Sequence, residues 1–107
     1  MENSSCTKRH ISEKLANGIK VLGDAWILCI VGCLADGEFR FNEIQHAIPH
    51  MNPATLTNRL KKLEKEKIIK RKEETVDKLS VTYALTAKGR TILPLLDDIK
   101  TFADKFV

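Results

Sequence analysis

Residues 52–66 read NPATLTNRLKKLEKE, and this stretch predicts a helix from Pro53 to about Glu66. Asn52 is a favourable N-cap, and proline suits the first helical position because its missing N–H would have no partner there. Leucines at positions 56, 60 and 63 form one apolar stripe. The opposite face holds small and polar side chains: Ala54, Asn58, Lys61, Lys62 and Lys65, with Thr55 on its flank. One face is therefore predicted to pack on a core and the other to point outward.

Two helices are predicted earlier in the chain. Apolar residues at helical spacing predict an amphipathic helix over residues 12–22, with Ser12 as its cap and Gly23 as its stop. Asp24 is placed to cap a second helix over residues 24–35. That segment is apolar on every side, so we expect it to be buried all round at the centre of the core.

The remaining segments complete the order of elements. Asn42 is expected to cap a short helix over residues 42–48. Over residues 68–86 the apolar spacing changes towards two and β-branched residues appear, which predicts a β-hairpin. Helical spacing resumes over residues 87–106, where Pro94 should bend the helix or mark its real start. This is the order of a winged helix-turn-helix, mainly α with a small β-hairpin (α+β), with an added C-terminal helix that we expect to serve dimerisation.

The composition is that of one globular domain. The chain has 107 residues, of which 43% are hydrophobic and 30% are charged. We expect residues 1–10 to be a flexible tail and residues 11–107 to be a single domain. The longest apolar stretch, Ala25 to Ala35, is well short of the roughly 20 residues needed to cross a bilayer, and the N-terminus lacks the features of a secretory signal. A cytoplasmic protein without a membrane span is expected.

The positive charge is concentrated in one segment. The net charge is +4, yet residues 53–72 alone hold eight basic and two acidic side chains. The parts before and after this segment each hold five basic and six acidic side chains. Such a basic segment suits a polyanion, whereas the alternative is a solvated helix face with no partner.

Several motifs together resemble one family of regulators. They are LGDAW at 22–26, DG at 36–37, RFNEI at 40–44, the run at 52–63 quoted above, and VTYALTAKG at 81–89. Over about residues 15–103 the chain resembles the HxlR family of bacterial and archaeal regulators, which are similar to MarR-type regulators. The resemblance implies a prokaryotic, nucleoid-associated homodimer joined through terminal helices. Lys67 stands where the family commonly has a glycine after the helix that begins at Pro53.

In a winged helix, the helix that begins at Pro53 would enter the major groove of double-stranded DNA while the hairpin touches the backbone. We expect Thr55, Asn58 and Lys62 to approach base edges. Arg59 and Lys61 are better suited to phosphates, although Arg59 lies nearer the apolar stripe and is alternatively expected to brace the helix through an acidic residue. Sequence-independent attraction is expected from further cations, namely Lys65, Lys70, Arg71 and Lys72. The predicted DNA-binding set is Asn52, Ala54, Thr55, Thr57, Asn58, Arg59, Lys61, Lys62, Lys65, Arg71 and Lys78.

The apolar stripe of the last helix favours pairing with a second copy of the chain. Two phenylalanines lie close to the C-terminus, where a single copy would leave them exposed. A dimer would also place two recognition helices about one turn of DNA apart, which predicts a roughly palindromic operator. The alternative is that the stripe closes over its own domain. The predicted interface comprises Ile11, Leu15, Ile92, Leu95, Leu96, Ile99, Phe102 and Phe106.

Neither a metal site nor a cofactor is predicted. Trp26 is expected to be a core anchor, and Cys29 and Cys33, one helical turn apart, to pack as small hydrophobes. The three histidines fall in separate segments without ligand spacing, and the sequence holds no pair of CxxC motifs. An enzyme such as a thiol oxidoreductase is disfavoured, because no nucleophile and base stand together in the sequence.

Cys6 is the candidate for redox chemistry. Some HxlR-type proteins sense oxidants through a cysteine near the N-terminus, so the resemblance implies this role, and Lys8 and Arg9 would favour the thiolate. The alternative is a surface thiol with no role. The identity of any oxidant or small-molecule effector stays open.

Taken together, these features predict a sequence-specific DNA-binding transcriptional regulator that acts as a homodimer. Repression is favoured over activation. The alternative is a winged-helix module for protein or RNA contacts, in which the basic segment only faces solvent. Selective binding of one DNA over a scrambled one separates the two hypotheses.

Overall fold

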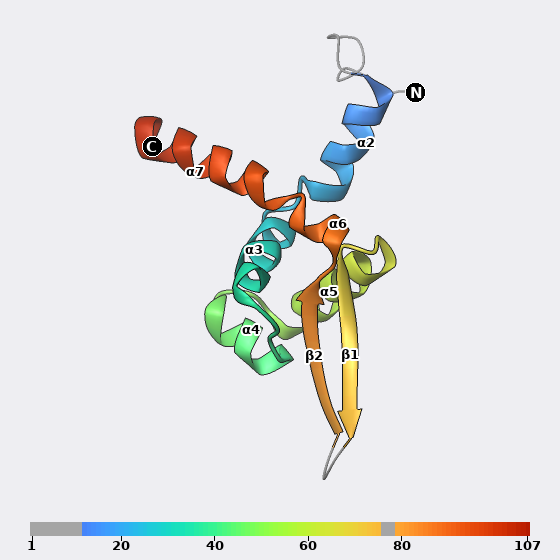
Figure 1. Cartoon of the computed structure of the whole chain (residues 1–107). Coiled ribbons are helices and arrows are strands. Elements are labelled where there is room, and N and C mark those ends of the chain that lie inside the picture. The colour runs from blue at the N-terminus through green and yellow to red at the C-terminus, as the bar shows by residue number, and fades with distance from the viewer. Residues whose placement is uncertain (1–11, 76–78) are drawn as a thin grey trace.

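The computed structural model describes residues 12–75 and 79–107 (Figure 1). In chain order the elements are α2 (Glu13–Leu22), α3 (Ala25–Cys33), the 3-10 helix η1 (Leu34–Asp36), α4 (Phe41–Ala47), α5 (Pro53–Lys65), β1 (Ile69–Thr75), β2 (Leu79–Leu85), α6 (Ala87–Arg90) and α7 (Leu93–Phe106). The strands β1 and β2 form one antiparallel hairpin. The predicted fold class, mainly α with a small hairpin, is confirmed.

Polar side chains fix the starts of three helices. Ser12 caps α2 by accepting a 3.0 Å hydrogen bond from a backbone N–H of the first turn. The Asp24 carboxylate does the same for α3 at 2.8 Å, and Asn52 does so for α5 at 2.7 Å. Each bond satisfies an amide that the helix itself leaves without a partner.

The start of α4 differs from the prediction by one residue. The backbone N–H of Arg40 donates to Oε1 of Glu43 at 2.7 Å, and the helix begins at Phe41. Asn42 is therefore inside the helix, and the prediction that it is the cap was wrong. The carboxylate within the first turn reaches back to the residue before the helix, as in one half of a capping box.

The apolar helix α3 is buried on one side only. Ile27, Ile30 and Val31 are fully buried, whereas Cys29 is exposed. The prediction that this helix is buried all round was wrong, because the rest of the chain packs against one side and a single copy leaves part of the other side open. The α-helix also ends at Cys33, where the tighter turn of η1 begins.

The C-terminal segment forms two helices and not the single helix predicted over residues 87–106. The first ends at Arg90, and the second begins at Leu93. Pro94 lies in the first turn of α7, where its missing N–H leaves no helical hydrogen bond unmade. The proline thus marks the real start of the last helix, which is one of the two outcomes that its position predicted.

One hydrophobic core joins the helices to the hairpin. The leucine stripe of α5 packs into it, as the spacing predicts. Phe39 adds a short β-bridge to the hairpin by exchanging backbone hydrogen bonds of 3.0 and 2.8 Å with Tyr83. The buried members of the core are Ile27, Ile30, Val31, Leu34, Ile44, Met51, Leu56, Leu60, Leu63, Ile68, Ile69, Leu85 and Ile92.

The terminal helices α2 and α7 project from the end of the molecule opposite the tip of the hairpin (Figure 1). Neither of them contains a buried residue. Within residues 12–75 and 79–107, no single helix is long and apolar enough to cross a membrane, and only the pair Glu13–Leu22 and Ala25–Asp36, bent by 70°, combines the length and composition.

Candidate nucleic-acid interface

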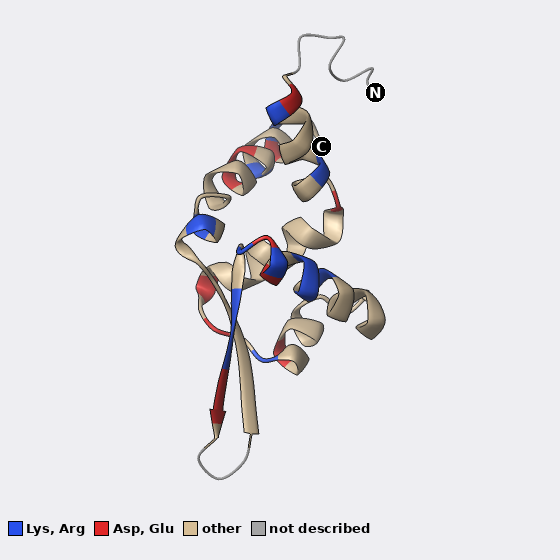
Figure 2. Cartoon of the chain, turned by 90° about the vertical axis from the view of Figure 1, so that its right-hand side faces the viewer, with Lys and Arg blue, Asp and Glu red and all other residues tan. Residues whose placement is uncertain are grey.

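The side of α5 that faces away from the core carries the small, polar and basic residues that the sequence places there. The leucine stripe fixes the rotation of α5 about its axis, so residues on the opposite side point outward. Asn52, Ala54, Asn58, Lys61 and Lys65 are exposed, and Thr55, Thr57, Arg59 and Lys62 are half-buried. Figure 2 shows Lys and Arg along α5 and on the adjoining half of the hairpin. We call this the basic surface: Lys61, Lys62 and Lys65 of α5 with Arg71 of β1, which lines one pocket with Lys61. Lys70 and Lys72 precede and follow Arg71 in the strand and therefore point to the other face of the hairpin.

Two of the predicted polar residues already have backbone partners. The Oδ1 atom of Asn52 accepts a hydrogen bond from the N–H of Ala54, so the amide nitrogen is the group it can offer to a ligand. The Oγ1 atom of Thr57 donates to the carbonyl of Pro53 at 3.0 Å and can still accept. Asn58 is exposed, and its amide can donate and accept at once, which suits a base edge.

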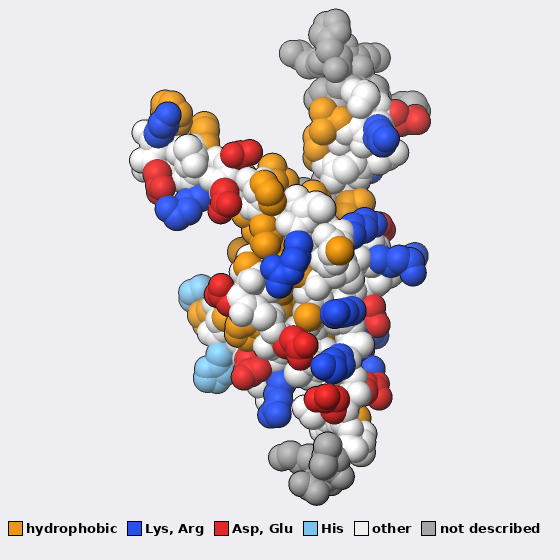
Figure 3. Space-filling model, in the orientation of Figure 1, with side chains coloured by type: hydrophobic (Ala, Val, Ile, Leu, Met, Phe, Trp, Pro, Cys, Tyr) orange, Lys and Arg blue, Asp and Glu red, His pale blue; other side chains and the backbone are white. Residues whose placement is uncertain are grey.

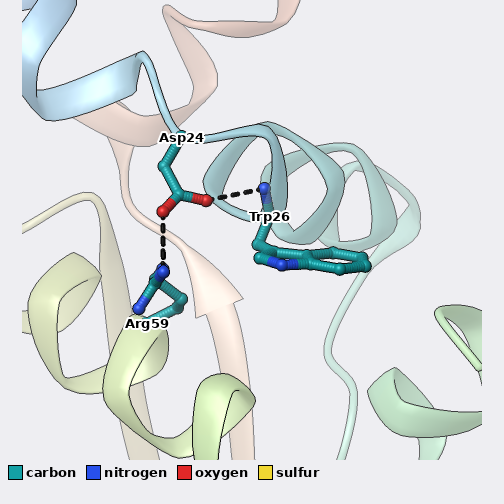
Figure 4. Close-up of polar contacts among 3 residues, drawn as sticks. All are labelled: Asp24, Trp26 and Arg59. Carbon is teal, nitrogen blue, oxygen red and sulfur yellow. Dashed lines mark hydrogen bonds and ion pairs between the residues drawn. The ribbon is translucent and has the colours of Figure 1, made fainter. Parts of the chain in front are cut away.

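Arg59 pairs with Asp24 of α3. Its Nε and Nη2 atoms each lie 2.8 Å from Oδ2 of Asp24 (Figure 4). The two side chains are 30% and 29% exposed. Of the two roles expected for Arg59, the structure shows the brace through an acidic residue and not an open phosphate ligand.

Asp24 connects this ion pair to the start of α3. Its Oδ1 accepts from the N–H of Trp26 at 2.8 Å while Oδ2 accepts from Arg59 (Figure 4). Burial raises the pKa of the Asp24 carboxyl, but the hydrogen bonds from Arg59 and Trp26 and the charge of Arg59 outweigh it, so the pKa lies below its ordinary value. One ionised carboxylate therefore caps the core helix and orients α5 against it.

Acidic neighbours partner some of the cations of β1. Arg71 is paired with Glu73, and the Nζ atom of Lys72 lies 3.8 Å from Oε2 of Glu74. Figure 2 shows acidic residues in the half of β1 nearer the tip of the hairpin. The positive charge of the hairpin is thus strongest beside α5 and is offset further out. Lys78, the last member of the predicted DNA-binding set, lies outside the described residues.

Lys67, two residues after the end of α5, has a left-handed conformation with φ of 62°. The N–H of Ile68 donates to the carbonyl of Leu63 at 2.9 Å, and the N–H of Lys67 donates to the carbonyl of Glu64 at 3.0 Å. These two bonds form a Schellman motif, in which glycine usually occupies the left-handed position. A side chain there costs roughly 1–2 kcal/mol because its Cβ crowds the carbonyl oxygen.

The C-terminal end of α5 is held against α6. The Oγ1 atom of Thr86 donates to the carbonyls of residues 67 and 68, at 2.6 and 3.1 Å, and Nζ of Lys88 donates to the carbonyl of Glu66 at 2.6 Å. Gly89 lets the backbones meet, because a Cβ at that position would overlap the carbonyl oxygen of Ile68. Thr86 also caps α6, because its Oγ1 accepts a 3.0 Å hydrogen bond from the N–H of Gly89. No local pattern in the sequence reveals its contacts with residues 67 and 68.

Apolar side chains line the two projecting helices. Figure 3 shows hydrophobic side chains on both of them. Phe102 and Phe106, 59% and 73% exposed, lie with their ring centroids 5.3 Å apart. Ile19 belongs to the same exposed stripe of α2 and was missing from the predicted interface. The arm faces, as we call these surfaces, comprise Leu15, Ile19, Leu95, Ile99, Phe102 and Phe106.

Two residues predicted at a dimer interface pack within the chain itself. Ile92 is 8% exposed and belongs to the core. Leu96 is half-buried, and its Cδ1 faces Gly32 of α3. The start of α7 thus packs on α3 before the helix leaves the domain. The prediction that Ile92 lies at a dimer interface was therefore wrong. Ile11 lies outside the described residues.

Within the described residues, no three His, Cys, Asp or Glu side chains are grouped so that they could hold a metal ion. Trp26 is half-buried and packs against the core. Cys29 is exposed, so the expectation that it packs as a small hydrophobe was wrong. Cys33 is half-buried, and burial raises the pKa of its thiol. Cys6, the candidate for redox chemistry, lies outside the described residues.

The order of elements and the basic surface define a winged helix-turn-helix protein, with α4 and α5 as the helix-turn-helix and the β1–β2 hairpin as the wing. The chain belongs to the HxlR-like helix-turn-helix family, whose family model matches residues 21–107. The resemblance seen in the sequence is thereby confirmed. Relatives in this family are named transcriptional regulators and not enzymes.

Individual relatives match most of the chain. It is similar to the uncharacterized HTH-type transcriptional regulator YvaP of Bacillus subtilis, with 32% identity over 94 residues that cover 88% of this chain and 87% of YvaP. It is also similar to the HTH-type transcriptional regulator YodB of the same organism, with 32% identity over 106 residues that cover 99% of this chain and 89% of YodB. The structure of the reduced form of YodB matches with a TM-score of 0.81 at 32% identity, over 90% of this chain and 94% of that one.

Proposed function

We propose that this chain is a cytoplasmic repressor that binds operator DNA sequence-specifically as a homodimer, with α5 as the recognition helix. The observation that carries the proposal is the outward side of α5, where an exposed amide and half-buried hydroxyl groups lie among exposed lysines. A helix of this kind offers hydrogen-bonding groups to base edges and positive charge to the phosphates on either side.

Base reading is assigned to the outward side of α5. Asn58 is exposed on the side opposite the leucine stripe, and an asparagine amide can bond to both N6 and N7 of adenine in the major groove. Thr55 and Lys62 flank it and complete the proposed reading set. Lys61 and Lys65 are exposed beside this set and are assigned to phosphates.

The ion pair between Arg59 and Asp24 supports the proposal by giving α5 a fixed orientation. Recognition by a helix depends on presenting the same side chains to the same groove positions, so a rigid mounting improves selectivity. In the proposal Arg59 is therefore a positioning residue, and it is not one of the groups that bind phosphate.

The homodimer is proposed from the arm faces. Large apolar side chains exposed together mark a surface that another molecule covers, and a second copy supplies the same surface by two-fold symmetry. A two-fold axis would place two copies of α5 on one side of the DNA, which requires a roughly palindromic operator. Repression follows if such a dimer occupies a promoter, because it excludes polymerase sterically.

The test is fluorescence anisotropy on labelled DNA from upstream of the chain's own gene and on scrambled DNA of equal length. We expect Asn58→Ala to weaken operator binding by about 1–3 kcal/mol and to leave binding of scrambled DNA nearly unchanged. Lys65→Ala should weaken both and reduce the slope of log K against log salt by about 1 per chain. Lys105→Ala, at the far end of α7, is the matched control and should change neither.

The competing hypothesis predicts a different result in the same titration. Equal binding of both DNAs that disappears with salt would mean that the basic surface has no sequence preference. That outcome would contradict operator recognition and favour a module for protein or RNA contacts.

A further inference from the structure

A groove of about 400 Å³ lies between α3 and the turn that connects α4 to α5. On the α3 side its wall is formed by Trp26, Cys29 and Cys33, and on the turn side by Ile48, Pro49 and His50. Ligand pockets for small organic molecules have volumes of about 300–1,000 Å³, so the groove is large enough for a compact one- or two-ring molecule. The basic surface and the arm faces contribute none of these residues.

The chemistry of the walls selects the kind of occupant. The described residues that line the groove include no Asp, Glu, Lys or Arg, which disfavours a polyanion or a charged peptide as the occupant. The Trp26 indole and the Pro49 ring offer apolar surfaces, and Cys29 and Cys33 line the groove beside them. Aromatic rings gain from offset contacts with other rings and from contacts with sulfur, which a saturated hydrocarbon lacks.

The groove also holds one polar side chain that can recognise a ligand group. The His50 imidazole can form a hydrogen bond with a polar group of a ligand, and His50 is exposed. An apolar pocket with few polar groups is the usual form of a site for a small aromatic molecule.

From these features we infer that the groove between α3 and the α4–α5 turn is a binding site for a small planar aromatic molecule with one hydroxyl or similar polar group. The ring lies against Trp26 and Pro49, beside the two thiols, and the polar group faces His50. This site is separate from the DNA-binding surface of the proposed function. Pro49 and His50 lead into α5, so an occupant of the groove would affect DNA binding only if the proposed function holds. Binding of the occupant itself does not depend on the proposed function.

Trp26 makes the inference directly testable, because it is the chain's only tryptophan and gives a single indole N–H signal in a proton–nitrogen correlation spectrum. The full chain is titrated with 2-naphthol as the probe. We expect a saturable shift of the Trp26 indole signal together with backbone shifts in the turn. Decahydro-2-naphthol, which has the same skeleton without aromatic rings, should bind at least about fivefold more weakly.

Two substitutions at one position separate space from chemistry. Cys29 is exposed, so Cys29→Phe should fill the groove without entering the core and should weaken 2-naphthol binding at least about tenfold. Cys29→Ala leaves the groove open and should stay within about threefold of the parent. If Cys29→Phe does not fold, Ala47→Phe fills the groove from an exposed position on the opposite wall.

Three results would overturn the inference. They are a shift that does not saturate, shifts confined to the apolar arm faces of α2 and α7, and unchanged binding in the groove-filling variant. Equal affinity for the saturated probe would overturn the aromatic class of ligand. DNA binding by the parent chain is scored separately, so its absence would contradict the proposed function without touching this site.

Discussion

Arg59 and Asp24, 35 residues apart in the chain, meet through two 2.8 Å contacts between one guanidinium and one carboxylate oxygen. The second oxygen of the same carboxylate caps α3. The start of the core helix and the middle of the proposed recognition helix therefore share one group. Changes at Asp24 should consequently appear both in stability and in how α5 is presented.

Substituting Asp24 should separate its two contributions. Asp24→Ala removes the cap and the ion pair, and we expect the free energy of unfolding to fall by about 1–2 kcal/mol. Asp24→Asn keeps a cap acceptor and loses only the charge, so the loss should be about 0.5–1 kcal/mol. Urea denaturation measures both. The exposed Asp98→Ala is the control, and equal losses in the two Asp24 variants would contradict a role for the cap.

The lowered pKa of Asp24 predicts a dependence of stability on pH. A carboxyl whose folded pKa lies below its unfolded value contributes stability that is complete above about pH 4 and is lost as pH falls towards the folded value. The stability difference between the parent and Asp24→Asn should therefore stay constant from about pH 7 to 5 and shrink between about pH 4 and 3. Urea titrations across this range test it. A difference that persists unchanged to the lowest pH would be inconsistent with the ion pair.

Lys67→Gly should stabilise the chain. The left-handed conformation at this position suits glycine, so we expect a gain of about 1 kcal/mol and a rise in Tm of several degrees. The matched control is the exposed Lys61→Gly, which places glycine inside α5 and should cost about 1 kcal/mol. Thermal denaturation followed by circular dichroism distinguishes them. A loss of stability in both variants would show that the Lys67 side chain has a role of its own.

Two glycine-to-alanine substitutions should have opposite signs. At Gly89 a methyl group overlaps the carbonyl oxygen of Ile68, and we expect a loss of about 2–3 kcal/mol as α6 moves off the end of α5. At Gly18, inside α2, nothing lies within 4 Å of the added carbon, and alanine should gain about 0.5–1 kcal/mol. Urea denaturation compares them. A neutral Gly89→Ala variant would contradict the close approach of α6.

Phe102→Glu should convert the proposed dimer to a monomer. The substitution places a charge on the arm faces, where burial in an interface would be unfavourable. Sedimentation equilibrium at micromolar concentration should give the mass of a dimer for the parent and of a monomer for the variant. Thr101→Glu, on the neighbouring exposed side of α7, is the control and should remain a dimer. A parent chain that sediments as a monomer would contradict the dimer directly.

Local patterns in the sequence were enough to predict most helices. The cap at Asn52, the proline after it and the leucine stripe are all features of neighbouring residues, and α5 begins at Pro53 accordingly. Pro94 likewise identified the start of the last helix within one residue. Such features act within one or two turns, so the linear sequence displays them.

Contacts between distant segments could not be predicted in this way. The pairing of Arg59 with Asp24 was only one of two alternatives, because helical periodicity places a residue on a face without naming its neighbour. Ile92 fits the spacing of α7 but precedes it, in the break after α6, and packs inward. The all-round apolar character of α3 predicts burial, yet how much of a helix is covered depends on the whole assembly.

The attachment of α6 to the end of α5 has a further consequence for the proposed dimer. Thr86 and Lys88 hold these two helices together, so the direction in which α7 leaves the domain is fixed relative to α5. In a two-fold dimer that direction determines how far apart the two recognition helices stand, and hence how many base pairs separate the half-sites. Half-site sequence and half-site spacing are then encoded by different parts of the chain, α5 and residues 86–92. Substitutions in α5 would then change the half-site sequence without changing the spacing, and substitutions in residues 86–92 would change the spacing without changing the half-site sequence.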